Sequence, residues 1–378
     1  MDGKKGKKMR VIVIGGGMAG LTVATQLKRT GQVDVLVIEA QDSLGGRTRT
    51  VDFPERPEGS SANAVPIDMG AAWIHGLTGN PLVALADEAK ATLFDFGHED
   101  LIPPIFDSEG HFITEEEKRT PQRHYDDLVA FMNDAKPLLR REQRDISLKD
   151  AVSRMCREDP EFDACWNSLG TEGQLLRWIV GSIESFYACP KEVLSVAFYD
   201  DWKMYPGGDA LVKSGYSTII RHLSSLLDPH ESRVLSPVRS IVWEATQSQK
   251  TSRRPQIVVT TERGEEFEAD VVVVTVSLGV LQSKTIDFRP QLPRFKQHAI
   301  DSMGFGLMNK VVLRFPRVFW HSCINNLFFG LADPVDRFRW WVNFYPICQQ
   351  PIIVCLVVNE FAHEVEDLAI RSVCFPLS

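Results

Sequence analysis

Four glycines and a glutamate near the N-terminus have the types and the spacing of a nucleotide site. Gly15, Gly17 and Gly20 form a GxGxxG pattern around Gly16, and Glu39 follows about 20 residues later. In such a pattern the first glycine makes a tight turn, the second lets the backbone approach a pyrophosphate, and the third lets a helix pack closely on a strand. A carboxylate at this distance accepts hydrogen bonds from a ribose. The pattern predicts a dinucleotide site and leaves NAD and FAD open.

The elements that must position these residues can also be read from the sequence. Residues 11–14 are a β-branched run typical of a buried parallel strand, and apolar residues recur at helical spacing over 21–27. Residues 33–38 predict a second strand, which Glu39 ends. The run "DVVVVTV" at 270–276 predicts a later strand of the same sheet, buried on both faces. An ordinary glycine turn in a βαβ unit is the alternative, but it would not require the acid.

Composition limits the class of protein. The chain has 378 residues, which exceeds the usual single core, so we expect two domains. Its hydrophobic content of 44% and charged content of 24% are those of a soluble globular protein, and a net charge of -8 disfavours nucleic acid as a partner. No apolar run is long enough to span a bilayer, so we expect no membrane association. The oligomeric state stays open.

Cysteine and histidine usage adds a prediction about compartment and metals. Seven cysteines, an odd number without a CxxC pair, favour reduced thiols in a cytoplasmic or nuclear compartment. The nine histidines show no metal-ligand spacing, so no metal is expected. Residues 1–9 form a basic tail, for which a targeting signal and a solvated segment both remain open.

A second glycine motif discriminates between the two dinucleotides. Gly45, Gly46 and Arg47 follow the second strand, where a glycine pair permits close backbone approach and the guanidinium can lie beside a pyrophosphate or a flavin ring. Together with the first motif, this opening resembles the flavin-containing amine oxidases, in particular their polyamine oxidase branch, to which the flavin-type histone lysine demethylases are related. Further blocks continue the likeness in the family's order: "IDMGAAWIHGLTGNPLVALA", "YPGGDALVKSGYSTII", "SPVRSIV", "DVVVVTVSLGVLQ" and "MGFGLMNKVVLRFPRVFW".

The resemblance implies FAD as cofactor and an α/β fold, α+β overall. We expect a Rossmann-type FAD-binding domain over 10–86 and 205–292. We expect a discontinuous substrate domain of helices and a mixed or antiparallel sheet over 87–204 and 293–378. The likeness fades after Leu368, before a second flavin signature of the family, so we expect weak FAD retention by a chain with this ending.

The resemblance also assigns cofactor contacts to particular residues. The glycines and the glutamate of the first motif would hold the ADP half of FAD. Gly46 and Arg47 would lie beside the pyrophosphate, and the backbone around Ala72 and Trp73 would line the isoalloxazine. Val238, in "SPVRSIV", matches the family's backbone contact to adenine.

Two residues receive catalytic roles from the same likeness. Lys310 resembles the lysine that holds a water against the reactive flavin nitrogen, although the strand pattern alone favours a surface lysine. His75 is similar to an active-site histidine of polyamine oxidases, and a histidine that caps the next turn is the alternative. Trp340 and Trp341 could form an ammonium cage, but core packing is favoured. For Glu184, a solvated carboxylate is favoured over an amine contact.

The predicted function is FAD-dependent oxidation of a small amine, a polyamine in the first instance, to an imine and then an aldehyde. Dioxygen would be the second substrate and hydrogen peroxide a product. The alternative is a non-catalytic relative that acts as a binding or interaction protein. A nicotinamide-dependent dehydrogenase would explain the first forty residues but not the Gly45–Arg47 motif or the Lys310 block.

Overall fold

The computed structural model describes residues 8–53, 64–95, 103–243, 257–320, 328–332 and 337–371. Most of the basic tail, together with Cys323 and Cys374, lies outside these ranges, and the five cysteines inside them are free. The chain separates into two compact units: unit 1 comprises Met1–Gly97 and Tyr205–Phe305, and unit 2 comprises His98–Met204 and Gly306–Ser378. Among the described helices, none has the length and apolar character needed to cross a membrane.

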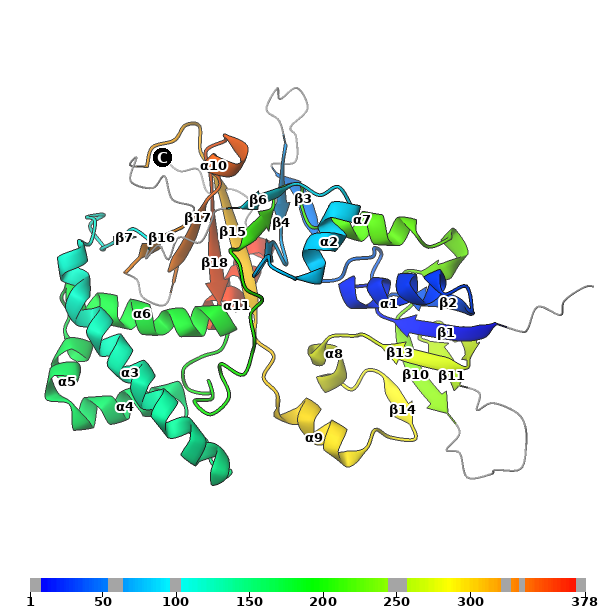
Figure 1. Cartoon of the computed structure of the whole chain (residues 1–378), viewed down its shortest axis with the longest axis horizontal. Coiled ribbons are helices and arrows are strands. Elements are labelled where there is room, and N and C mark those ends of the chain that lie inside the picture. The colour runs from blue at the N-terminus through cyan, green and yellow to red at the C-terminus, as the bar shows by residue number, and fades with distance from the viewer. Residues whose placement is uncertain are drawn as a thin grey trace, which may run out of the picture. The chain divides into compact units, whose positions relative to one another are not determined.

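Unit 1 is built on a parallel sheet with the strand order β13-β1-β2-β9, of which β13, β1 and β2 are labelled in Figure 1. Its strands are β1 (Met9–Ile14), β2 (Val33–Ile38), β9 (Ser232–Arg233) and β13 (Val271–Val274), and helix α1 (Met18–Arg29) connects β1 to β2. The apolar face of α1 packs on β1 and β2 in a shared core. The predicted Rossmann-type α/β arrangement is therefore confirmed.

The prediction that β13 is buried on both faces is wrong. Val271 and Val274 are 39% and 38% exposed. Within the described chain β13 pairs with β1 on one side only, so it forms an edge of the sheet and its side chains are less covered than those of β1. A β-branched run predicts the strand, but burial depends on its neighbours.

A second sheet of unit 1, with the order β12-β11-β10-β14, packs against the first through an apolar core. Its strands are β10 (Val238–Trp243), β11 (Ile257–Thr261), β12 (Glu266–Ala269) and β14 (Asp287–Arg289). Five shorter strands form two small sheets: β3 (Thr50–Phe53) with β4 (Val65–Asp68), and β5 (Trp73–Ile74), β8 (Ala210–Val212) and β6 (Leu93–Asp95) in the order β5-β8-β6.

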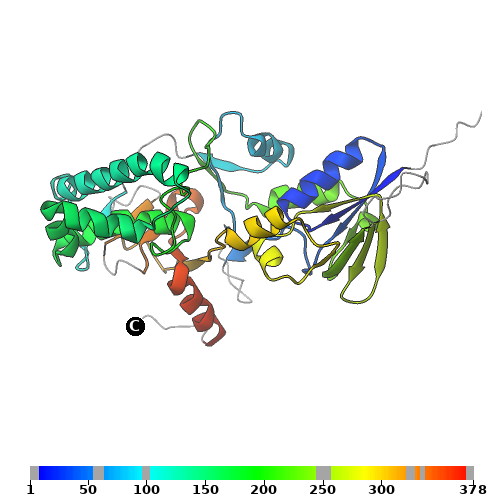
Figure 2. The ribbon, with the colours of Figure 1, turned by 90° about the horizontal axis from the view of Figure 1, so that it is seen from below.

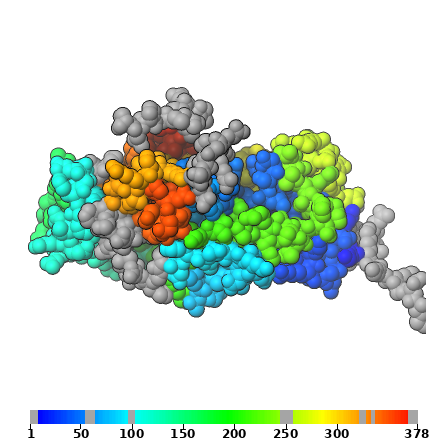
Figure 3. All heavy atoms as spheres, turned by 90° about the horizontal axis from the view of Figure 1, so that it is seen from above, coloured from blue at the N-terminus to red at the C-terminus, as the bar shows by residue number. Residues whose placement is uncertain are grey.

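The remaining helices of unit 1 are α2 (Pro81–Glu88), α7 (Ser217–Ser225), η1 (Pro229–Glu231), α8 (Leu278–Gln282) and α9 (Arg294–Ser302). Helices α2 and α7 lie side by side at the surface (Figure 3). The N-terminus of α7 is fixed by Asp68, whose buried carboxylate accepts the Tyr216 N–H at 2.9 Å. The Tyr216 hydroxyl donates to the Trp73 carbonyl at 3.3 Å, which connects this helix to β5.

Unit 2 combines a mostly antiparallel sheet, β15-β18-β17-β16-β7, with a helical layer. The strands are β7 (Ile105–Phe106), β15 (Met308–Arg314), β16 (Phe328–Leu331), β17 (Trp340–Asn343) and β18 (Ile352–Val358). The helices are α3 (Glu115–Arg141), α4 (Leu148–Glu158), α5 (Pro160–Asn167), α6 (Thr171–Tyr187), α10 (Tyr345–Cys348) and α11 (Asn359–Arg371). The long helix α3 runs beside α6 (Figure 2), and its start is fixed by a capping box between Thr114 and Glu117.

Candidate functional site

The two glycine motifs meet at the carboxyl ends of β1 and β2. The Gly15 N–H donates to the Ile38 carbonyl, and the Gly45 N–H donates to the Gly16 carbonyl, both at 2.9 Å. Gly17 and Gly45 also form a parallel bridge. Because β1 has β2 on one side and β13 on the other, the motifs lie where connections leave the sheet in opposite directions, the usual ligand position of an open parallel sheet.

Packing requires some of these glycines but not others. A Cβ at Gly20 would lie 1.9 Å from the Gly15 carbonyl oxygen, and Gly15 has a φ of +104°. A Cβ at Gly17, by contrast, would meet only the Gly45 oxygen, at 3.8 Å. The protein therefore needs glycine at the first and last positions for its own packing. At Gly17 the missing side chain leaves room for a ligand to approach the backbone.

Glu39 is the buried acid of the site, with 8% of its surface exposed. Its Oε2 accepts the Gly16 N–H at 2.6 Å, and its Oε1 accepts the Gln41 N–H at 2.8 Å. A carboxylate has about four lone-pair positions, so both oxygens keep acceptor capacity after these bonds. The loop thus holds the carboxylate in place and leaves it able to accept from a ribose diol.

The start of α1 is suited to an anion. Gly17 is its N-cap, no side chain caps the first turn, and no acidic residue lies in that turn. The first backbone N–H groups of a helix lack partners within the helix and carry the positive end of its dipole. Thr275 supports the turn from β13, because its Oγ1 donates to the Gly15 carbonyl at 3.0 Å. Thr275 was not among the predicted site residues, although it lies within the predicted strand and directly follows β13.

The second group of predicted contacts lies beside the first. Gly46 has a φ of +57°, and its Cβ position is 3.5 Å from the Gly17 Cα. The guanidinium of Arg47, next to it, lies 5.8 Å from the ring centre of Phe305, and its carbonyl accepts the Ala71 N–H at 3.1 Å. The segment that leads to Ala72 and Trp73 is therefore attached to the glycine loop by its backbone.

Val238 is brought to the same end of the sheet. It begins β10, and its buried side chain packs in the core between the two sheets. Just before it, the Ser236 N–H donates to the Glu39 carbonyl at 2.9 Å, and the Leu235 N–H donates to the Gln41 carbonyl at 2.8 Å. The segment that carries Val238 thus runs beside the ribose acceptor, but the adenine contact itself stays a prediction.

His75 directly follows β5, and its ring contacts a carboxylate that the sequence analysis did not consider. His75 Nδ1 lies 2.7 Å from Asp209 Oδ2, and Asp209 Oδ1 accepts the Gly76 N–H at 2.9 Å. The two residues are 134 positions apart in the chain and meet because β5 pairs with β8. The next helix, α2, is capped by the side chain of Asn80, whereas the His75 ring contacts Asp209.

Lys310 lies in unit 2, on β15, where it is partly buried and opposite Leu356 of β18. It lies in the same unit as the tryptophan pair, which belongs to the core as expected. Trp341 is buried and stacks on Phe329, and its indole N–H donates to the Phe338 carbonyl at 2.7 Å. The catalytic role of Lys310 stays a prediction.

The expectation of a solvated Glu184 is wrong. Its carboxylate is buried on α6, and its Oε1 accepts the Lys191 N–H at 2.7 Å. The residues after α6 fold back over the end of the helix, where Cys189 N–H donates to the Glu184 carbonyl at 3.1 Å. A glutamate on a helical pattern does not reveal that a following loop will cover it.

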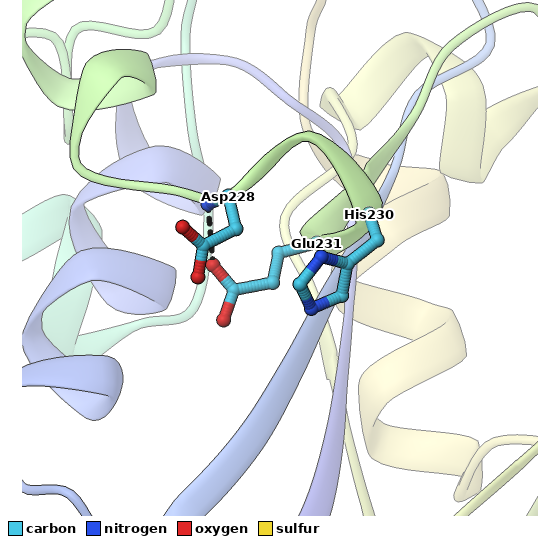
Figure 4. A group of neighbouring side chains, drawn as sticks. All are labelled: Asp228, His230 and Glu231. Atoms are coloured by element: carbon cyan, nitrogen blue, oxygen red, sulfur yellow. Dashed lines mark hydrogen bonds between the residues drawn. The ribbon is translucent and has the colours of Figure 1, made fainter.

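One cluster outside this region has the composition of a metal site. Asp228, His230 and Glu231, at η1, bring their ligand atoms within 4.8 Å of one another (Figure 4). The ammonium of Lys28 already lies 2.9 Å from Asp228 Oδ2 and 2.5 Å from Glu231 Oε2, and these contacts raise the pKa of Lys28. The two acids also form the capping box of η1. The cluster is therefore explained by local structure and an ion pair.

Comparison with known proteins identifies the family. The model of the flavin containing amine oxidoreductases matches residues 18–372. The chain belongs to this family. It is 30% identical to polyamine oxidase 2 of Arabidopsis thaliana over 375 residues, which cover 97% of this chain and 70% of that protein. It is 29% identical to lysine-specific histone demethylase 1 homolog 3 of the same plant, over 94% of this chain and 24% of that protein.

The fold comparison agrees with this family. A putrescine oxidase redesigned in cofactor binding, as a triple mutant, superposes with a TM-score of 0.67 at 20% identity, over 95% of this chain and 77% of that one. The flavin that the family carries is FAD, as predicted, and unit 1 has the parts that its ADP half requires. These are the room above Gly17, the uncapped helix start and the spare acceptor capacity of Glu39.

Proposed function

We propose that this amine oxidoreductase oxidises a polyamine with bound FAD, with unit 1 holding the cofactor and unit 2 contributing to amine binding. The carbon–nitrogen bond beside the reacting carbon becomes an imine, which water hydrolyses to an aldehyde. The two electrons and two protons removed pass to dioxygen and form hydrogen peroxide. Membership of the amine oxidoreductase family supports the oxidation of an amine, and the likeness to polyamine oxidase 2 favours a polyamine.

The observation that carries the cofactor assignment is the difference between Gly17 and Gly20. Packing within the protein requires Gly20, because a Cβ there would overlap the Gly15 carbonyl oxygen. A Cβ at Gly17 would meet only the Gly45 oxygen, at 3.8 Å, and Gly17 stands at an uncapped helix start. Glu39 then provides acceptors for a ribose next to it. Bound FAD supplies a hydride acceptor and a route for electrons to dioxygen.

The chain's own contribution to the chemistry is binding and the control of protons. An aliphatic amine has a pKa near that of lysine, about 10, so most of it enters as an ammonium ion at neutral pH. Only the neutral amine can supply a lone pair to the carbon that loses hydride. A site that accepts the ammonium proton, or that excludes water from the charged form, therefore speeds the reaction.

The test compares two glycines that cap helices with the same backbone geometry. Gly17 and Gly170 are both N-caps, with φ -76° in each case, and neither helix start has a side-chain cap. Ala is a poor N-cap, so Gly17→Ala and Gly170→Ala should lower the stability of the fold by similar small amounts. Only Gly17→Ala should weaken FAD binding, because its methyl group would keep the cofactor from approaching the backbone N–H groups. The expected loss is about 10- to 100-fold, since hydrogen bonds to a charged group are worth about 1.5–3 kcal/mol.

The measurements are FAD affinity, unfolding by urea, and peroxide release from the FAD-loaded chain with spermine, spermidine and N-acetylspermine. Peroxide with at least one of these amines, in one-to-one ratio with the aldehyde, supports the proposal. If a fully FAD-loaded chain releases no peroxide with any polyamine but does so with a simple monoamine, the proposed polyamine substrate is wrong and a monoamine takes its place. Equal FAD affinities in the two glycine variants would remove the assignment of Gly17.

A further inference from the structure

The pair formed by His75 and Asp209 has a geometry that determines where the histidine carries its proton. Asp209 uses both oxygens: Oδ2 lies 2.7 Å from His75 Nδ1, and Oδ1 accepts the Gly76 N–H at 2.9 Å. The Asp209 side chain is 26% exposed, whereas that of His75 is 56% exposed. The carboxylate thus lies behind the ring, and the ring remains accessible.

The backbone around the pair is closely constrained. Thr78 N–H donates to the Pro206 carbonyl at 2.7 Å, and the Asn80 side-chain amide donates to the His75 carbonyl at 3.0 Å. A Cβ at Gly76 would lie 1.9 Å from the Tyr205 carbonyl oxygen. The two loops therefore meet at backbone contact distance, and the ring and the carboxylate are held by the framework rather than by their own contact alone.

An ionised carboxylate has no hydrogen to donate, so the hydrogen of the 2.7 Å contact must belong to Nδ1. In a neutral imidazole the other nitrogen then has a lone pair, because only one ring nitrogen carries hydrogen. Elsewhere in the chain, His111 lies 3.4 Å from Asp107 with its side chain 72% exposed. That contact is too long and too exposed to fix a tautomer in the same way.

We propose that Asp209 is a positioning residue that holds His75 as the Nδ1–H tautomer, so that Nε2 is presented as a hydrogen-bond and proton acceptor for the amine substrate. That the amine substrate is the partner of Nε2 rests on the proposed function. When an ammonium proton moves to Nε2, the products are the neutral amine and an imidazolium. The Asp209 carboxylate offsets the imidazolium charge. The pair thereby supplies the deprotonation step that the oxidation needs.

The decisive variant is Asp209→Asn, because an amide cannot make both of the observed contacts as an acceptor. If its oxygen keeps the Gly76 N–H, its NH₂ group faces Nδ1 and must donate to it. His75 then changes to the Nε2–H tautomer, and the acceptor is lost while size and packing are kept. Asp87→Asn, at an exposed position of α2, removes the same charge from the same unit and serves as the control.

The primary readout is the ¹⁵N NMR spectrum of histidine-labelled protein, recorded at alkaline pH so that the neutral ring is observed. The His75 signals are assigned by their absence in His75→Gln. We expect a protonated Nδ1 and an unprotonated Nε2 in the unmodified protein and in Asp87→Asn, and the reverse in Asp209→Asn. An Nε2–H tautomer in the unmodified protein, or an unchanged tautomer in Asp209→Asn, would overturn the proposal.

Turnover provides the second readout. Loss of the carboxylate that orients a metal-ligating histidine typically costs about 10- to 100-fold in activity, and we take the same range for Asp209. We expect a loss of this size in kcat/KM for Asp209→Asn that shrinks as pH rises toward the amine pKa, since free neutral amine then needs no acceptor. A loss that is independent of pH would mean a structural role only. Because the tautomer is measured without any amine, absence of amine oxidation would contradict the proposed function and leave the positioning result intact.

Discussion

The carboxyl end of β1 and β2 in unit 1 and the β15-β18-β17 sheet in unit 2 satisfy their polar groups in different ways. At the first, Glu39 and the start of α1 keep acceptor and donor capacity beyond their contacts within the protein. At the second, the indole N–H of Trp341 is bonded to a backbone carbonyl, and Arg339 donates to Ser185 Oγ at 2.7 Å. Unit 1 thus has polar groups prepared for a ligand, whereas this sheet of unit 2 has a packed aromatic core.

The difference shows which kind of residue can be assigned from structure alone. A buried carboxylate that keeps acceptor capacity beyond its two backbone hydrogen bonds, beside a glycine that packing does not require, is suited to a ligand that donates hydrogen bonds. A lysine on a packed sheet does not imply one, since many lysines lie at such edges with their stems against apolar surface. Lys310 therefore keeps its role as a prediction from family resemblance, and experiment has to decide it.

The largest expected effect tests the unit 2 side of this comparison. Lys310→Met should slow flavin reduction, reoxidation by dioxygen, or both, by about 10²- to 10⁴-fold if the lysine acts in proton transfer. Arg314→Met, four residues along the same strand and therefore on the same face, is the matched control and should leave both rates unchanged. Anaerobic stopped-flow reduction with spermine, followed by mixing with dioxygen, separates the two steps. Equal rates for the two variants would place Lys310 outside the active site.

A smaller effect tests the unit 1 side. Glu39→Ala removes acceptors from the ribose position and should weaken FAD retention, since a hydrogen bond involving a charged group contributes about 1.5–3 kcal/mol. The variant also leaves the Gly16 and Gln41 N–H groups without their acceptors, so FAD occupancy must be compared at equal folded fraction. Asp34→Ala removes an exposed acid from β2, the strand that Glu39 follows, and should retain FAD normally. Equal occupancy in both variants after dialysis would argue against Glu39 as the ribose acceptor.

The smallest effect concerns the packing that supports unit 1. Burial, with a further contribution from Asp68, raises the pKa of Tyr216 to about 12 from its ordinary value of 10.0. The folded state therefore keeps the phenol proton while the unfolded state loses it, so this contribution to stability is complete below pH 10 and is lost as pH rises toward 12. Tyr216→Phe should cost about 0.5–1.5 kcal/mol at neutral pH, for the lost bond to Trp73, and should flatten the alkaline decline.

Urea unfolding at neutral pH and through the alkaline range measures both parts of that prediction. Tyr199→Phe is the matched variant in unit 2, because burial raises the pKa of Tyr199 to about 12 as well. A decline that is equally steep in the unmodified protein and in Tyr216→Phe would show that Tyr216 does not stay protonated in the folded chain.

The sequence by itself determined those parts of the protein whose structure is set by residues close together in the chain. The strand, glycine turn, helix and acid from Val11 to Glu39 lie in one contiguous segment, where residue spacing translates directly into geometry. The Gly45–Arg47 motif then completed the family likeness that predicted FAD and the Rossmann-type unit. The tertiary structure was needed wherever the answer depended on which distant segments meet.

Three outcomes depended on what lies against an element, whether a distant strand, no strand at all or a following loop. Asp209 reaches His75 only through the pairing of β5 with β8, β13 is partly exposed because it is an edge strand, and Glu184 is covered by the loop that follows its helix. The periodicity of apolar residues along a helix or strand indicates which face of the element is apolar, but it does not indicate what packs against that face. Contacts between segments more than a hundred residues apart are decided by packing, and here packing alone joined the histidine to its carboxylate.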